Sequence, residues 1–165
     1  MSQIKYKLQI NLILIFSILS ILFAFYVEYI LGHKPCNLCL LQRLPYILTI
    51  VVIILLVIFK NFEKLSFLFL SIIFLFGALL ALYHFGIEQG IVSESFVCAS
   101  DVSVGTLNKE EILKQLKIRQ VSCKDVTFTI LGFSLATINT FVSAILTIIT
   151  YRIFIKYEKK QQETN

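Results

Sequence analysis

The sequence has no tryptophan, only two prolines and six glycines in 165 residues, and few charges. Charged residues make up 15% of the chain, against about 25% in ordinary soluble domains. Hydrophobic residues make up 58%, more than a single soluble core can bury, so the composition indicates an integral protein of a lipid bilayer. The net charge of +5 does not indicate a nucleic-acid partner, because the basic residues flank apolar runs and form no patch interleaved with aromatics.

Four apolar runs, nearly free of charge, divide the chain. Each is close to the ~20 residues that cross ~30 Å of hydrocarbon as a helix. A segment in lipid must pair its own backbone groups, which excludes open strands. The sequence therefore predicts an all-α integral membrane protein, with a four-transmembrane-helix bundle in a single membrane domain over residues 1–165. The predicted helices cover residues 8–27, 40–59, 65–85 and 126–151.

The predicted loops at residues 28–39 and 86–125 lie on one side of the membrane, and both termini lie on the other. Basic residues on the terminal side lie in short segments beside helix ends, where the positive-inside bias acts most strongly. We therefore expect both termini in the cytoplasm. The first apolar run is longer than the apolar part of a usual signal peptide, and no small-residue cleavage site follows it, so we expect it to be retained.

All four cysteines fall in the two external loops. Cys36 and Cys39 lie in the first loop, and Cys98 and Cys123 lie in the second. An even number of cysteines on the outer face suits an oxidising compartment.

The second loop also contains the stretch NKEEILKQLKIRQ. Asn108 and Glu111 give it a capping-box pattern, and its apolar residues share one face. We expect a short amphipathic helix along the membrane surface, with a solvated loop helix as the alternative.

The stretch KPCNLCLLQRLPY carries a C-x-x-C pair at the start of the second apolar run. A static disulfide there closes a very small ring and contributes little stability. Zinc sites usually bring two close pairs, whereas Cys98 and Cys123 are well separated, so no metal site is predicted, although copper handling by part of the set stays open. The third interpretation is redox exchange, because free N–H groups of a helix that begins near Pro35 favour a thiolate.

Arg43 follows Cys39 by four residues and lies on the same helical face. A charge at mid-membrane costs ~2.5–3.5 kcal/mol on insertion scales. Snorkelling alone explains a boundary arginine, but the nearby Cys39 favours a second role, stabilisation of a thiolate. A thiolate at the lipid boundary can pass electrons to an apolar two-electron acceptor in the bilayer. A quinone fits that description, and the chain has no G-x-G-x-x-G motif for a nicotinamide or flavin.

The segment CNLCLLQR resembles the C-x-x-C-x-x-x-R signature of the disulfide bond formation protein B (DsbB) family. The resemblance extends over the whole chain in helix count, cysteine placement, arginine spacing and length. It implies a quinone-dependent protein thiol:disulfide oxidoreductase of the bacterial inner membrane. Such a protein reoxidises a soluble periplasmic thioredoxin-like dithiol oxidase, DsbA, and passes the electrons to the membrane quinone pool, either ubiquinone or menaquinone.

The resemblance also implies a role for each cysteine. Cys98 would form the mixed disulfide with the partner, and Cys123 would then exchange with Cys36. Cys39 would be left as the thiolate that faces the quinone, with Arg43 stabilising its charge.

The segment LYHFGIEQG resembles the family's sequence at the outer end of the third helix. The resemblance makes His84 a possible quinone contact. The alternative is an interfacial histidine without a chemical role.

Two other functions stay open from the sequence. One is an enzyme similar to vitamin K epoxide reductase, although there the C-x-x-C is expected near the last helix rather than before the second. The other is a non-enzymatic membrane metal-handling protein with four exposed cysteines.

Overall fold

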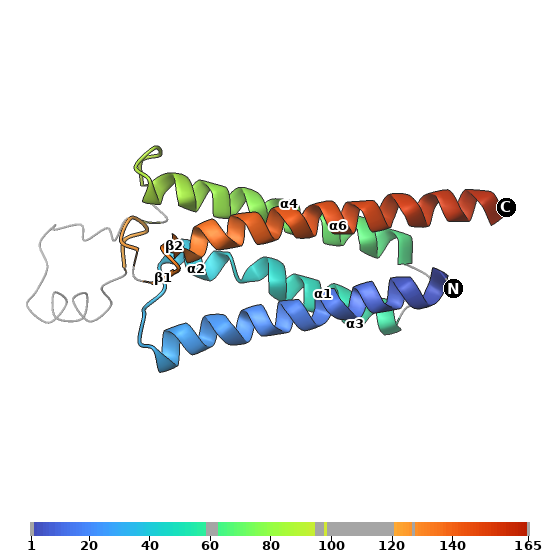
Figure 1. Ribbon diagram of the computed structural model, residues 1–165, viewed down its shortest axis with the longest axis horizontal. Coiled ribbons are helices and arrows are strands. Elements are labelled where there is room, and N and C mark those ends of the chain that lie inside the picture. Colours follow the sequence, from blue (N-terminus) through green and yellow to red (C-terminus); the bar gives the residue numbers. More distant parts are fainter. Residues whose placement is uncertain (1, 59–62, 95–97, 99–120, 127, 165) are drawn as a thin grey trace, which may run out of the picture.

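The computed structural model describes residues 2–58, 63–94, 98, 121–126 and 128–164, and these are almost entirely helical (Figure 1). The amphipathic helix predicted from Asn108 onward lies outside the described residues. In chain order the elements are α1 (Ser2–Phe25), the π-helix η1 (Tyr26–Ile30), α2 (Asn37–Leu41), α3 (Leu44–Ile58), α4 (Glu63–Glu88), β1 (Thr129–Ile130), β2 (Phe133–Ser134) and α6 (Leu135–Thr164).

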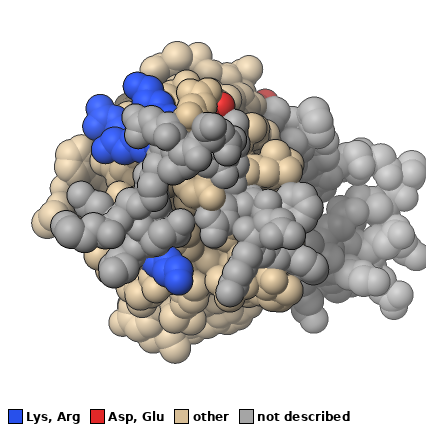
Figure 2. All heavy atoms as spheres, turned by 90° about the vertical axis from the view of Figure 1, so that its right-hand side faces the viewer, with Lys and Arg blue, Asp and Glu red and all other residues tan. Residues whose placement is uncertain are grey.

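The prediction of an all-α bundle with four membrane-crossing helices is confirmed. Within the described part of the chain, the stretches long and apolar enough to cross a membrane are Lys7–Ile30, Asn37–Ile58, Leu65–Glu88 and Leu135–Lys159. The helices run side by side, with both ends of the chain at one end of the bundle and α2 at the other (Figure 1). Lys and Arg side chains gather on the end that carries the termini (Figure 2).

The second span is broken near its start. A turn at Gln42 and Arg43 separates α2 from α3. Pro45 has no N–H, so it cannot complete the helical hydrogen bond to the carbonyl four residues earlier. The Arg43 N–H instead bonds the Leu40 carbonyl at 3.1 Å, in a tighter turn. The sequence predicts one continuous helix over residues 40–59, and the proline explains the difference.

The fourth span starts later than the predicted position, residue 126. Strands β1 and β2 form an antiparallel hairpin ahead of α6, which begins at Leu135. Leu131 and Gly132 have φ angles of 52° and 85° at the tip of this hairpin. The left-handed conformation is one that glycine adopts without strain, and it is typical of two-residue hairpin turns. The turn therefore separates the first apolar residues of this run from the helix.

Close packing of three helices depends on Gly77 of α4. A Cβ atom built at Gly77 would lie 3.0 Å from Pro45 Cγ on α3 and 3.7 Å from Ser143 Oγ on α6. The first distance is shorter than an ordinary carbon–carbon contact of ~3.5–4.0 Å. The missing side chain thus lets α3 approach α4 beside the broken start of the second span.

The apolar residues of the bundle separate into two buried clusters. One lies along the middle and terminal parts of the helices and contains Ile13, Tyr46, Ile53, Phe67, Leu70, Phe74, Leu146 and Ile153. The other lies at the opposite end and contains Cys36, Leu38, Ile87, Cys98 and Cys123. The cysteines therefore belong to a packed core of their own.

We expect Gly77→Val to destabilise the bundle, because its side chain would collide with the Pro45 ring. Overpacking of this kind costs ~1–3 kcal/mol, and each kcal/mol lowers the thermal midpoint by about 2–4 °C for a chain of this size. Leu79→Val is the matched control, because Leu79 is 57% exposed on the outside of the same helix. Equal thermal midpoints for the two variants in detergent would contradict the close contact.

Candidate functional site

The Cys36–Cys39 pair is held in place by the first turn of α2. Cys36 is the N-cap of this helix, and its sulfur accepts a hydrogen bond from the Cys39 N–H at 3.3 Å. The two sulfurs lie 3.0 Å apart and carry no bond between them. Local helix geometry therefore brings the two thiols into direct contact.

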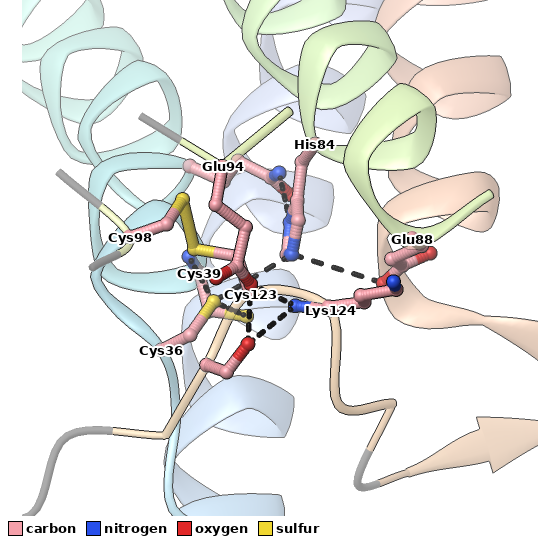
Figure 3. The surroundings of a disulfide bond; sticks show 10 residues. Cys36, Cys39, His84, Glu88, Glu94, Cys98, Cys123 and Lys124 are labelled. Atoms are coloured by element: carbon pink, nitrogen blue, oxygen red, sulfur yellow. Dashed lines mark hydrogen bonds and ion pairs between the residues drawn. A yellow bond between two sulfur atoms is a disulfide. The ribbon is translucent and has the colours of Figure 1, made fainter. Parts of the chain in front are cut away.

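The second cysteine pair packs onto the first. Cys98 and Cys123 form a disulfide, each only 2% exposed, and lie in the same buried cluster as Cys36 (Figure 3). Glu94 holds the segment that carries Cys123, because its carboxylate accepts hydrogen bonds from the Ser122 hydroxyl and, at 3.0 Å, from the Lys124 N–H. All four sulfurs thus meet at one end of the bundle, as the sequence predicts from their shared side of the membrane.

Hydrogen bonding makes Cys36 the acidic member of the reduced pair. Its pKa is lowered from 9.0 to about 4, first because the Cys39 thiol is hydrogen-bonded to its sulfur. The His84 ring, 3.6 Å away, lowers the pKa further, whereas burial acts in the opposite direction. The surroundings of Cys36 therefore favour its thiolate form. The thiolate on Cys39 that the family resemblance implies, beside Arg43, belongs to the intermediate in which Cys36 is bonded to Cys123.

Arg43 lies against the first helix. A guanidinium nitrogen is 2.6 Å from Glu28 Oε2 in η1, and the guanidinium carbon is 5.2 Å from the centre of the Phe25 ring. These partners neutralise the cation and cover its face. The ion pair ties the turn between α2 and α3 to the end of the first span, and it explains how a charge is accommodated so close to lipid.

His84 lies inside the bundle rather than at its surface. Its side chain is 4% exposed, and its two ring nitrogens face different partners. Nε2 lies 3.6 Å from the Cys36 sulfur, and Nδ1 lies 2.9 Å from the amide nitrogen of Gln42. Glu88, one turn further along α4, places a carboxylate oxygen 3.7 Å from Nε2. His84 is therefore a buried residue in contact with the reactive pair.

A cavity of about 230 Å³ opens beside the cysteine pair, between α1, α3 and α6. Most of its lining is apolar, with aromatic and aliphatic side chains from all three helices. The polar and reactive groups that line it are Ser20, Glu28, His33, Lys34, Cys39, Gln42, Arg43, Tyr46 and Asn139. Cys39 therefore faces the cavity, whereas Cys36 faces His84 and the disulfide. His84 is not among the described residues that line this cavity.

Three of these side chains could also act as metal ligands. Cys36, Cys39 and His84 place three donor atoms within 4.8 Å of one another. Tetrahedral zinc with ~2.3 Å bonds to sulfur holds two thiolates about 3.8 Å apart, whereas these sulfurs are 3.0 Å apart. The separation fits a dithiol that is ready to form a disulfide better than it fits a pair of zinc ligands.

Several polar residues of the site were not assigned from the sequence. Glu28 ends the first apolar run, Asn139 interrupts the fourth, and Glu88 lies in the segment that contains His84. Gln42 lies within the C-x-x-C-x-x-x-R segment itself. These residues could have been identified from the sequence by their position inside or at the end of a membrane span. Polar residues there are costly in lipid and usually face the bundle interior.

Comparison with known proteins agrees with this geometry. Residues 6–153 match the family described as disulfide bond formation protein DsbB. The chain is also similar to an uncharacterized protein of Rickettsia prowazekii (strain Madrid E), with 31% identity over 147 residues, which cover 87% of this chain and 85% of that protein. No solved structure matches the chain. The chain therefore belongs to the DsbB family, the membrane disulfide oxidoreductases.

Proposed function

We propose that the protein reoxidises the dithiol of a soluble, thioredoxin-like DsbA partner and passes the electrons to a membrane quinone. One observation carries the proposal. The reduced Cys36–Cys39 pair lies between the Cys98–Cys123 disulfide on one side and the largely apolar cavity on the other. The disulfide can connect the thiol pair to an electron donor, and the apolar cavity offers a place for an electron acceptor.

The thiol exchange can be written with its atoms and electrons balanced. A partner thiolate attacks Cys98, the Cys98–Cys123 bond breaks, and the second partner thiol releases the oxidised partner. Cys123 then attacks Cys36 of an oxidised Cys36–Cys39 pair, and Cys39 leaves as a thiolate. Attack of Cys98 on Cys123 restores that disulfide and frees Cys36. This sequence ends with the Cys98–Cys123 disulfide formed and the Cys36–Cys39 pair reduced.

The acceptor must take two electrons and two protons when the Cys36–Cys39 disulfide forms. A bound quinone would supply that acceptor, and its apolar ring fits the lining of the cavity. Typical small-molecule pockets measure ~300–1,000 Å³, so a cavity of about 230 Å³ suits the ring alone. Cys39 would donate from the cavity wall, and the Arg43 cation would stabilise negative charge that develops beside it.

The charge distribution supports an orientation with both termini in the cytoplasm of a bacterial inner membrane. Lys and Arg side chains gather on the end with both termini (Figure 2), as the positive-inside bias requires. In this orientation the four cysteines face the periplasm, where disulfides persist. In this orientation the Cys98–Cys123 pair lies on the same side of the membrane as a periplasmic partner.

Arg43→Ala should slow the oxidation of the Cys36–Cys39 pair by quinone about 100-fold. Removal of one preorganised donor that stabilises developing charge has an effect of this size. Reduced protein is mixed with quinone without oxygen, and free thiols are trapped with a maleimide and resolved on a gel. Arg152→Ala is the matched control, an exposed arginine of α6 (Leu135–Thr164) that does not line the cavity. Equal oxidation rates for the two variants would show that Arg43 does not assist the reaction.

For the partner step, we expect Cys123→Ser to accumulate a mixed disulfide through Cys98. Without its intramolecular partner, the Cys98 thiol exchanges with the disulfide of the oxidised thioredoxin-like protein, and Cys123 is no longer there to displace that protein. Non-reducing gels and mass spectrometry identify the adduct. Cys98→Ser is the control and should give none. An adduct that forms through Cys36 in both variants would show that the partner reacts with the first pair instead.

A further inference from the structure

A chain of hydrogen bonds leads away from His84 through the interior of the bundle. The Gln42 amide nitrogen lies 2.9 Å from His84 Nδ1. Asn139 of α6 donates from its amide nitrogen to Gln42 Oε1 at 2.8 Å. The Tyr46 hydroxyl donates to Asn139 Oδ1 at 2.5 Å, and the Ser143 hydroxyl approaches the same oxygen at 3.4 Å. Three helices thus contribute to one continuous polar chain.

The direction of this chain is determined at both of its ends. At one end, the Cys36 sulfur accepts the Cys39 N–H and lies 3.6 Å from His84 Nε2, so a proton on Nε2 has an acceptor there. At the other end, two hydroxyls surround Asn139 Oδ1, so this atom accepts. Each amide in between then accepts with its oxygen and donates with its nitrogen, which leaves only a lone pair on His84 Nδ1. The histidine proton must therefore lie on Nε2.

We propose that Gln42, Asn139 and Tyr46 are positioning residues that hold His84 in one tautomer, with its Nε2–H aimed at the Cys36 sulfur. Gln42 is the key member, because its NH2 group faces Nδ1 and leaves no acceptor for a proton there. The relay thereby fixes the orientation of the ring. An Nδ1–H group would face the Gln42 NH2 group, so two hydrogen-bond donors would point at each other. Gln42 is only 8% exposed, so this mismatch would be costly.

The relay also forms part of the cavity wall. Gln42, Tyr46 and Asn139 all line the cavity that Cys39 faces. A molecule in the cavity would therefore contact the same groups that orient His84 toward Cys36. The relay residues therefore lie between His84, which faces Cys36, and the cavity that Cys39 lines. The role of the relay in thiol oxidation rests on the proposed function, whereas the tautomer does not.

The tautomer can be measured directly by 15N nuclear magnetic resonance of histidine-labelled protein with Cys36 and Cys39 reduced and no quinone added. The chain has only two histidines, so a His33→Gln sample assigns both ring signals. We expect a protonated Nε2 and an unprotonated Nδ1 for His84. A proton on Nδ1, in a neutral or a doubly protonated ring, overturns the proposal, and this wild-type result is decisive even if a variant fails to fold.

Gln42→Glu tests the cause, because a carboxylate has nearly the same shape but only accepts hydrogen bonds. It should transfer the His84 proton to Nδ1 and slow oxidation by quinone about tenfold, as is typical when the partner that orients a histidine is lost. Thr49→Val is the matched control, a fully buried residue of α3 outside the relay, and should change neither readout. An unchanged tautomer in Gln42→Glu overturns the relay, and a switched tautomer with an unchanged rate overturns its positioning role.

Discussion

The contact between the Cys36 and Cys39 sulfurs, at 3.0 Å, is the interaction on which the rest of the site depends. It needs a helical turn that starts at Cys36 and a second element that covers both thiols. The first comes from the short helix α2, and the second comes from α4 and from the disulfide segment that packs on it. Pro45 interrupts the helix and so separates this turn from the long membrane helix α3. The thiol pair therefore has its own packed core at the end of the bundle.

The two thiols differ because their surroundings differ. Cys36 points into the buried cluster, where the Cys39 N–H and the His84 ring favour its thiolate. Cys39 lines an apolar cavity that also receives the Arg43 side chain. A dithiol with one sulfur toward a disulfide and the other toward an apolar cavity suits a transfer of electrons between two chemically different partners. The Arg43–Glu28 ion pair lowers the cost of the charge at this boundary.

The four-helix architecture could be predicted from sequence because long uncharged runs have few solutions in lipid. The cysteine pairs could be placed on one side for the same reason. The break at Gln42 and the late start of α6 at Leu135 were not predicted, because a hydropathy pattern does not register a missing N–H or a left-handed turn. The partners of Arg43 and His84 were missed as well, since Glu28 and Gln42 meet them only through tertiary packing.

The central claim is that electrons leave the Cys36–Cys39 pair for a quinone. The most direct measurement is the stoichiometry of that transfer in the purified protein without oxygen, with quinol followed by absorbance and each disulfide located by mass spectrometry. One quinol formed for each new Cys36–Cys39 disulfide is the expected result. Thiols that stay reduced in the presence of quinone, or a disulfide that forms with no matching quinol, would contradict the claim.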